Sequence, residues 1–152
     1  MNALESLLAD LSSGDERRAE AAVAPLIGLG DDSVQALLEL TGSPDVDTRW
    51  WGLRVLAASP HLKTEWLIPY LNDPAPEVRQ CAALGLAGKP NERAVEPLVR
   101  ALNDEDSMVA SLAANALVKT GSPAVPSLIE AVKTGPQSQR IHALRALAEI
   151  RD

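Results

Sequence analysis

Two adjacent tryptophans, Trp50 and Trp51, followed one helical turn later by Arg54, are the residues best suited to binding chemistry. Indole rings and guanidinium groups supply much of the energy of protein interfaces. Neighbouring residues on a helix point about 100° apart, so both rings cannot face a core equally. We expect Trp51 to be buried and Trp50 to be an exposed binding residue beside Arg54. The alternative is that Trp50 packs against Trp66, Tyr70 or a neighbouring loop and only fills space.

Residues suited to catalysis or metal binding are few and scattered. The two histidines, His61 and His142, have no second metal ligand at a useful spacing. Cys81, the single cysteine, stands at an apolar position without a nearby histidine, which favours a buried structural thiol over a nucleophile. Glycine-rich phosphate loops, GxSxG elbows and His-Glu metal motifs are missing from the sequence. We therefore predict a non-catalytic protein without a metal or cofactor.

The composition predicts helices and narrows the classes of partner. Hydrophobic residues make up 46% of the chain, led by Ala and Leu, whereas Phe is absent; helices favour Ala and Leu, and strands favour aromatic and β-branched residues. The net charge of −7 gives no attraction to nucleic acid. No apolar run approaches the roughly 20 residues of a bilayer span, and the first residues lack the positive charge of a signal peptide. We expect a cytoplasmic protein that binds neither nucleic acid nor membranes.

A repeat of about 30 residues must position these side chains. Apolar residues at i, i+3, i+4 and i+7 mark one amphipathic helix per copy. The motifs of these first helices start at Leu4, Val34, Thr64, Val95 and Val125. Each copy continues into a second helix that carries a leucine, at Leu26, Leu56, Leu86, Leu117 or Leu147, and a small residue four positions earlier, at Ala22, Gly52, Ala82, Ala113 or Ala143. These two positions share one helix face, against which a neighbouring helix can pack closely.

The predicted fold is all-α: a right-handed α-α superhelix of about ten helices in five antiparallel pairs, forming one domain over residues 1–152. The copies span approximately residues 2–30, 31–60, 61–90, 91–120 and 121–152. At one junction we expect Gly121 to end a helix, Ser122 to cap the next and Pro123 to occupy its first turn. Pro25 lies within the second helix of the first copy, where a kink or an early end is expected.

In this register the whole chain resembles the HEAT family, and in particular the short repeats named for phycobilisome lyases. The most specific stretch is Asn72-Asp73-Pro74-Ala75-Pro76-Glu77-Val78-Arg79, followed by Cys81-Ala82-Ala83-Leu84-Gly85-Leu86 and by Ala94-Val95-Glu96-Pro97-Leu98-Val99. The resemblance implies hydrogen-bonded ladders between stacked repeats, made by the Asp of the turn and the Arg six residues later, and Asp73 and Arg79 match. The other copies lack one or both residues, as where Ala110 follows Asp104, so we expect a partial ladder.

The resemblance also implies a binding side. In the family the first helices tend to line the convex side and the second helices the concave side, which usually binds. The candidate binding residues are the second-helix positions away from the buried stripe, namely Trp50, Arg54, Gln80, Leu84, Met108, Asn115, Ile141 and Arg145, with Asp47, Glu77, Ser111 and Ser138 beside them. They predict a protein-interaction scaffold that binds a protein or a peptide.

Other functions stay open at this point. HEAT-like folds include bilin lyases, iron-dependent hydroxylases and alkylpurine DNA glycosylases; the hydroxylases need His-Glu pairs and the glycosylases a basic groove, and the sequence has neither. Bilin handling needs mainly a shaped groove with Trp and Arg, so a phycobilin lyase-like protein is an alternative, as is a structural segment of a longer repeat protein. The last copy has no polar capping helix after it, so end-to-end association through the C-terminal repeat stands beside a monomer.

Overall fold

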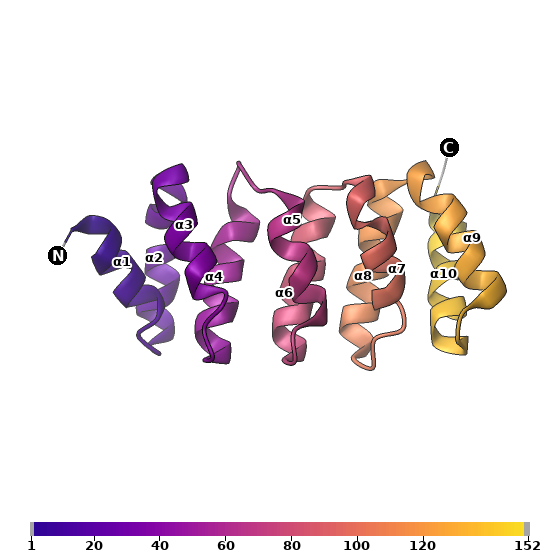
Figure 1. The fold of residues 1–152 in the computed structure, drawn as a ribbon, viewed down its shortest axis with the longest axis horizontal. Coiled ribbons are helices and arrows are strands. Elements are labelled where there is room, and N and C mark those ends of the chain that lie inside the picture. The colour runs from indigo at the N-terminus through magenta and orange to yellow at the C-terminus, as the bar shows by residue number, and fades with distance from the viewer. Residues whose placement is uncertain (1, 151–152) are drawn as a thin grey trace. The chain divides into compact units, whose positions relative to one another are not determined.

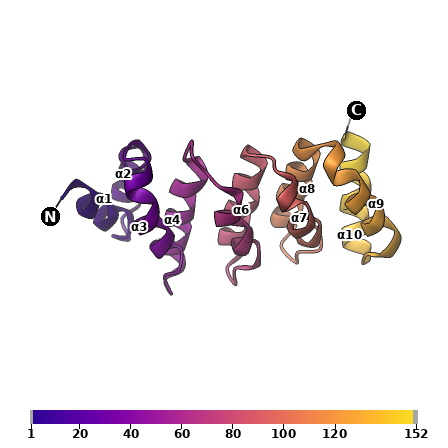
Figure 2. The ribbon, with the colours of Figure 1, turned by 45° about the horizontal axis from the view of Figure 1, so that its top comes forward.

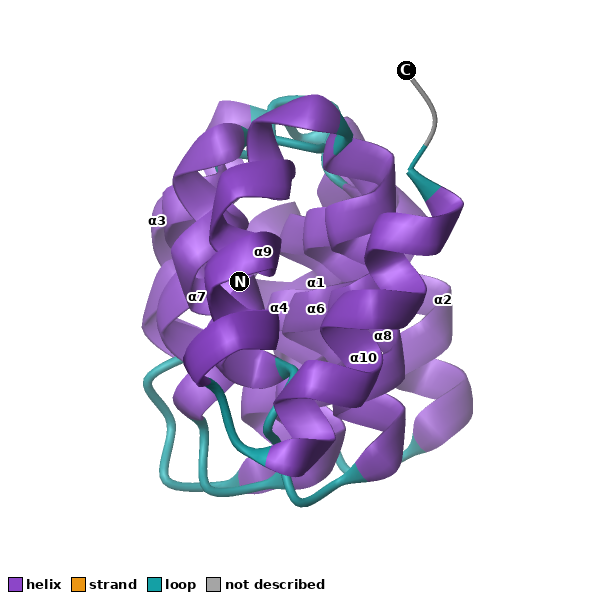
Figure 3. Cartoon of the chain, turned by 90° about the vertical axis from the view of Figure 1, so that its right-hand side faces the viewer, coloured by secondary structure: helices purple, strands orange, loops and turns teal. Residues whose placement is uncertain are grey.

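A computed structural model describes residues 2–150, which fold into ten α-helices joined by short turns (Figure 1). The α-helices are α1 (Ala3–Leu11), α2 (Glu16–Gly28), α3 (Asp31–Leu40), α4 (Val46–Ala58), α5 (Thr64–Leu67), α6 (Pro76–Gly88), α7 (Val95–Ala101), α8 (Ser107–Thr120), α9 (Val125–Thr134) and α10 (Gln137–Glu149). The 3-10 helices are η1 (Ile68–Asn72), η2 (Glu92–Ala94) and η3 (Ser122–Ala124). Residues 2–150 contain no strand (Figure 3), which confirms the all-α prediction.

The contacts divide the chain into two compact units, Met1–Trp66 and Leu67–Asp152. In the first unit α1 packs against α2 and α3 packs against α4, while α2 also contacts α4. The buried side chains of this unit form one cluster of Leu11, Ala19, Ala22, Val23, Leu26, Leu37, Trp51, Val55 and Leu56. Two helix pairs therefore share a single core.

In the second unit the second helices of three successive copies are neighbours, because α8 packs against both α6 and α10. Figures 1 and 2 show α6, α8 and α10 following one another along this unit. The first helices α7 and α9 contact each other, and in the view of Figure 3 they lie on the opposite side from α8 and α10. The leucines that point between the two sets, each at most 1% exposed, are Leu86, Leu98, Leu117 and Leu128. The repeated apolar positions thus form the core of this unit.

The first helix of the third copy departs from the predicted pattern. Its α-helical geometry ends at Leu67, and residues Ile68–Asn72 form the 3-10 helix η1. Pro69 explains the change, because proline has no N–H for the bond to the carbonyl four residues earlier and its ring crowds that turn. Leu67 and Leu71 are nevertheless buried, so the apolar stripe survives the change of helix type.

Two expectations about helix ends are wrong in part. α2 continues through Pro25 to Gly28, so the helix does not end early. At the junction after α8, Gly121 ends the helix with a φ of 78°, as expected, but the side chain of Ser122 does not cap the next helix. The backbone supplies the contact instead, since the carbonyl of Gly121 accepts a hydrogen bond from the N–H of Ala124 at 2.9 Å.

The small residue of the second-helix stripe permits close packing, most clearly at Gly52. A Cβ atom at this position would lie 3.1 Å from the Cβ atom of Leu40 and 3.3 Å from the carbonyl oxygen of Leu37, both on α3. The corresponding residues of the other copies, all at most 1% exposed, are Ala22, Ala82, Ala113 and Ala143. α3 and α4 therefore approach each other more closely than a larger residue would allow.

Replacing Gly52 by valine should lower the free energy of unfolding by about 1–3 kcal/mol, the usual cost of overpacking. The added atoms meet the backbone and a Cβ atom of α3, which cannot rotate away. Gly88→Ala is the control, because nothing lies within 4 Å of its Cβ position, and there alanine should stabilise the helix by up to about 1 kcal/mol. Urea unfolding followed by circular dichroism measures both variants. Equal effects would contradict the close packing at Gly52.

Candidate functional site

Each second helix of the second unit presents at least one large apolar side chain to solvent. Leu84 on α6 is 59% exposed, Met108 on α8 is 54% exposed and Ile141 on α10 is 50% exposed. Helical geometry explains how the sequence does this: Leu84 and Leu86 are two residues apart, so they point about 200° apart, one outwards and one into the core. Single exposed apolar side chains are ordinary on a protein surface, and the three helices that carry these side chains are packed side by side.

Polar candidate residues stand on the same three helices. Asn115 on α8 and Arg145 on α10 are exposed, and neither side chain makes a hydrogen bond or an ion pair with another residue in the range 2–150. Gln80 on α6 is half-buried, and its Nε2 donates a hydrogen bond to Oδ1 of Asp106 at 3.2 Å. The structure therefore leaves Asn115 and Arg145 available to a partner, while Gln80 already has an intramolecular role.

Asp106, the residue that Gln80 contacts, caps the amino terminus of α8. Its Oδ1 accepts a hydrogen bond from the N–H of Val109 at 3.0 Å. This bond is the main reason why the pKa of the Asp106 carboxyl lies below its usual value. Burial is the next largest effect and opposes it, while the bond from Gln80 and the charge of Arg79 lower the pKa by smaller amounts. The carboxylate therefore stays ionised near neutral pH and holds the first turn of α8 in place.

The tryptophan pair of the first unit is only partly accessible. Trp51 is 6% exposed, as predicted, and Trp50 is half-buried against the core cluster, as is Trp66. The Trp50 and Trp51 ring centroids lie 4.8 Å apart, edge to face. The Arg54 guanidinium lies 5.9 Å and 5.5 Å from these two rings, and its Nη2 donates to Oε1 of Glu20 at 3.1 Å. The expected exposure of Trp50 is therefore wrong, because its ring packs on Trp51 and on the core cluster and only the outer edge of the Trp50–Arg54 cluster reaches solvent.

Arg79 joins the third copy to the fourth. Its Nη1 donates to the carbonyl oxygens of Asp73 and Pro74 at 2.8 and 3.2 Å. Its Nε and Nη2 donate to the two carboxylate oxygens of Asp104 at 2.9 and 3.1 Å. The Asp73 carboxylate accepts from the N–H of Ala75 at 2.9 Å. This ion pair is the contact between stacked repeats that the family resemblance implied for Arg79. Its acceptor, Asp104, occupies the same turn position as Asp73 one copy later and was not itself predicted as the partner.

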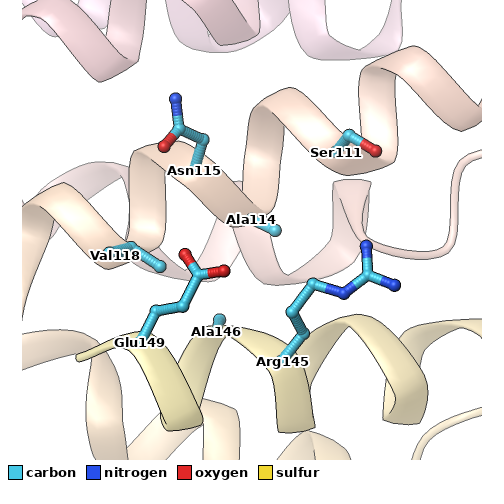
Figure 4. A pocket seen from close by; sticks show the side chains of 7 residues that line it. All are labelled: Ser111, Ala114, Asn115, Val118, Arg145, Ala146 and Glu149. Carbon is cyan, nitrogen blue, oxygen red and sulfur yellow. The ribbon is translucent and has the colours of Figure 1, made fainter.

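A groove of about 180 Å³ runs between α8 and α10 (Figure 4). Its lining residues are Ser111, Ala114, Asn115 and Val118 on α8 and Arg145, Ala146 and Glu149 on α10. Asn115 and Arg145 are predicted binding residues, whereas Glu149 and the two alanines are not. The groove could have been predicted from Ala114 and Ala146, because two small residues at facing positions of neighbouring helices leave a depression between the helices.

A second hollow, of about 260 Å³, lies on α9 and α10 and is lined by Val132, Gln137, Arg140, Ile141 and Leu144. Leu144 is 55% exposed and is not among the predicted binding residues. The residues at the same position of the two preceding copies, Ala83 and Ala114, are buried under the next helix. Leu144 and Ile141 therefore form an apolar edge on α10.

His142, on the same helix, has no metal-binding geometry. Its imidazole is partly buried, which lowers its pKa, and the charge of Arg145 lowers that pKa further. Its Nδ1 is buried without a hydrogen-bond partner. Residues 2–150 contain no group of three His, Cys, Asp or Glu side chains that could hold a metal ion.

In the same part of the chain, no helix has the length and apolar content that crossing a bilayer requires.

Comparison with known proteins agrees with this architecture. The sequence profile described as HEAT repeats matches residues 64–151. The chain belongs to the HEAT-repeat family. The match includes η1, α6, α8 and α10, and therefore the groove and the three exposed apolar side chains. No curated protein matches the chain in sequence.

Solved structures show the same repeat fold. A chain from the complex of CpcE and CpcF of phycocyanin lyase from Nostoc sp. PCC7120 is 24% identical, with a TM-score of 0.70 over 95% of this chain and 98% of that chain. An engineered protein is 23% identical, with a TM-score of 0.61 over 99% of this chain and 80% of its own. A designed armadillo repeat protein, solved in complex with the peptide (KR)4, is 18% identical, with a TM-score of 0.52 over 97% of this chain and 82% of that chain. At these identities the likeness shows a helical-repeat fold.

Proposed function

We propose that this HEAT-repeat protein is a non-catalytic scaffold that binds a protein or peptide on the face formed by its second helices. The observation that carries the proposal is the exposure of Leu84, Met108 and Ile141 on three adjacent helices. Fully burying a Leu, Met or Ile side chain contributes about 1.5–3 kcal/mol, and covering the exposed half of each of these three contributes roughly half of that, so together they supply a useful part of a binding energy. The polar Asn115 and Arg145 beside them provide specificity.

In the first unit the proposal assigns a binding role to Trp50 and Arg54. Both occupy the second-helix positions that correspond to candidates in the other copies, and the outer edge of their cluster is accessible. The Glu20 carboxylate already pairs with Arg54 at 3.1 Å, so a partner would have to supply its own carboxylate in exchange. We therefore expect these two residues to contribute less to binding than the anchors on α6, α8 and α10.

Panning a random peptide library displayed on phage against the full chain tests the proposal. Peptides that bind the wild-type chain should lose more than about tenfold in affinity for the triple variant Leu84→Ser, Met108→Ser and Ile141→Ser, since truncating interface anchors costs more than about 1 kcal/mol each. Ile129→Ser is the control, because Ile129 is 42% exposed but lies on the first helix α9. Unchanged affinity for the triple variant, or an equal loss for Ile129→Ser, would contradict the proposed face.

A second candidate function is bilin handling, supported by the structural similarity to a chain of a phycocyanin lyase complex. The groove between α8 and α10 and the Trp50–Arg54 cluster supply the types of side chain that such a ligand needs. Mixing the chain with a free linear tetrapyrrole and recording its visible absorbance tests this function. A saturable spectral shift that is weakened by Arg145→Met or Arg54→Met supports it, and an unchanged spectrum excludes it.

A further inference from the structure

The groove between α8 and α10 brings together four polar side chains that have no partner in the described part of the chain. Ser111 and Asn115 stand on α8, and Arg145 and Glu149 stand on α10 (Figure 4). None of these four side chains makes a hydrogen bond or an ion pair with another residue between 2 and 150. Donors and acceptors of both charges therefore surround one depression without satisfying one another.

The floor of the groove limits what can enter it. Ala114 and Ala146 are 7% and 1% exposed, so their methyl groups form a smooth and shallow base. The volume of about 180 Å³ is smaller than the roughly 300 Å³ at which pockets for drug-sized ligands begin. A compact cofactor would stay mostly outside. An extended chain lying across the helices would place one or two residues in the groove and leave the rest in contact with the neighbouring surface.

The side chains of the groove define the chemistry of that residue. A guanidinium binds a carboxylate through two parallel hydrogen bonds, so Arg145 selects an acidic side chain. The amide of Asn115 offers both a donor and an acceptor, which complements one peptide group. Glu149 lies one turn after Arg145 and repels any acid on its own side of the groove, so only the Arg145 guanidinium attracts a carboxylate there. The groove therefore favours one isolated carboxylate over an acidic run.

The same surface also sets the distance between the apolar residue Leu84 and the charged residue Arg145. Leu84 on α6, Asn115 on α8 and Arg145 on α10 occupy the same position of three successive copies, and all three are exposed. Neighbouring packed helices lie about 8–10 Å apart, so Leu84 and Arg145 are separated by about 16–20 Å. An extended peptide rises about 3.3 Å per residue and covers that span in about five or six residues.

We propose that this groove binds an extended peptide segment through a single carboxylate side chain, held by Arg145, about five or six residues from an apolar side chain that packs on Leu84. The inference rests on the proposed function of the second-helix face and names the class of peptide that this face accepts. Because Arg145 binds the carboxylate, its contribution to peptide affinity can be measured separately from that of the apolar anchors.

The test uses peptides selected on the full wild-type chain from a random phage-displayed library. We expect Asp or Glu to be enriched five or six positions from a large apolar residue. A selected peptide, synthesised and labelled, should bind Arg145→Met roughly tenfold or more weakly, the effect of losing a charge-assisted hydrogen bond. Replacing the acid of the peptide by its amide should weaken binding equally. The amide peptide should bind Arg145→Met about as weakly as either single change alone predicts, because both changes remove the same contact.

Arg100→Met is the matched control, since Arg100 is an exposed arginine on α7 and its loss changes the net charge by the same amount. Its affinity for the peptide should equal that of the wild type. Selected peptides that depend on Leu84 but show no positional acid, or that bind Arg145→Met as well as wild type, overturn this inference and leave the proposed function standing. Selection of no peptide by the wild-type chain overturns both.

Discussion

Replacing Arg79 by methionine should lower the free energy of unfolding by about 3–5 kcal/mol, the usual cost of removing one partner of a buried ion pair. The pair is nearly dry, because the Arg79 and Asp104 side chains are 10% and 11% exposed. Methionine keeps an apolar stem but removes the guanidinium bonds to the Asp104 carboxylate and to the carbonyls of Asp73 and Pro74. The midpoint of urea unfolding, followed by circular dichroism, measures the loss.

Two further variants identify the cause of that loss. Asp104→Asn in the Arg79→Met background removes the lone buried charge and keeps an acceptor for the N–H of Asp106, 2.9 Å away, so it should recover at least about 1 kcal/mol. Arg18→Met breaks the ion pair with Asp10 on the surface, where the Arg18 side chain is 55% exposed and the Asp10 side chain 40%. This variant should lower the free energy of unfolding by only about 0–1 kcal/mol. If Arg79→Met cost no more than Arg18→Met, the buried pair would not stabilise the fold.

The Arg79 contact also shows what the repeat pattern can and cannot predict. Periodic apolar positions such as Leu26, Leu56 and Leu86 specify where helices lie and which side they bury, because each position requires the same environment in every copy. These leucines are at most 1% exposed. A contact between copies depends on two residues that the pattern treats separately. The family resemblance implied a contact of Arg79 between stacked copies, and the structure identifies Asp104 as its partner.

The candidate site was harder to predict than the fold for the same physical reason. Side-chain type and helix face were enough to single out Leu84, Met108, Asn115 and Arg145 as exposed residues. The groove beside Asn115 exists because Ala114 and Ala146 on neighbouring helices are both small, and that is a property of a pair of helices. The 3-10 geometry after Leu67 shows a local limit as well, since Pro69 changes the hydrogen bonding without interrupting the apolar spacing.

Replacing Leu117 by alanine should lower the free energy of unfolding by about 2–5 kcal/mol. Leu117 is fully buried on α8, and α8 packs against both α6 and α10. The cavity left by the lost methyl groups therefore weakens the packing of one helix against two neighbours, and in a repeat protein the interfaces between neighbours carry much of the stability. Alanine is at least as good a helix former as leucine, so the loss reports packing alone. The midpoint of urea unfolding is the measurement.

Position within the array should set the size of the effect. Leu147 on α10 occupies the same repeat position but is half-buried, so Leu147→Ala should cost less than Leu117→Ala because fewer contacts are lost. Leu144→Ala, at a side chain 55% exposed, should change stability by no more than about 0.5 kcal/mol. The order Leu117, then Leu147, then Leu144 follows from burial, since the substitution is the same each time. A different order would mean that the leucine stripe of the second helices is not the core that holds the repeats together.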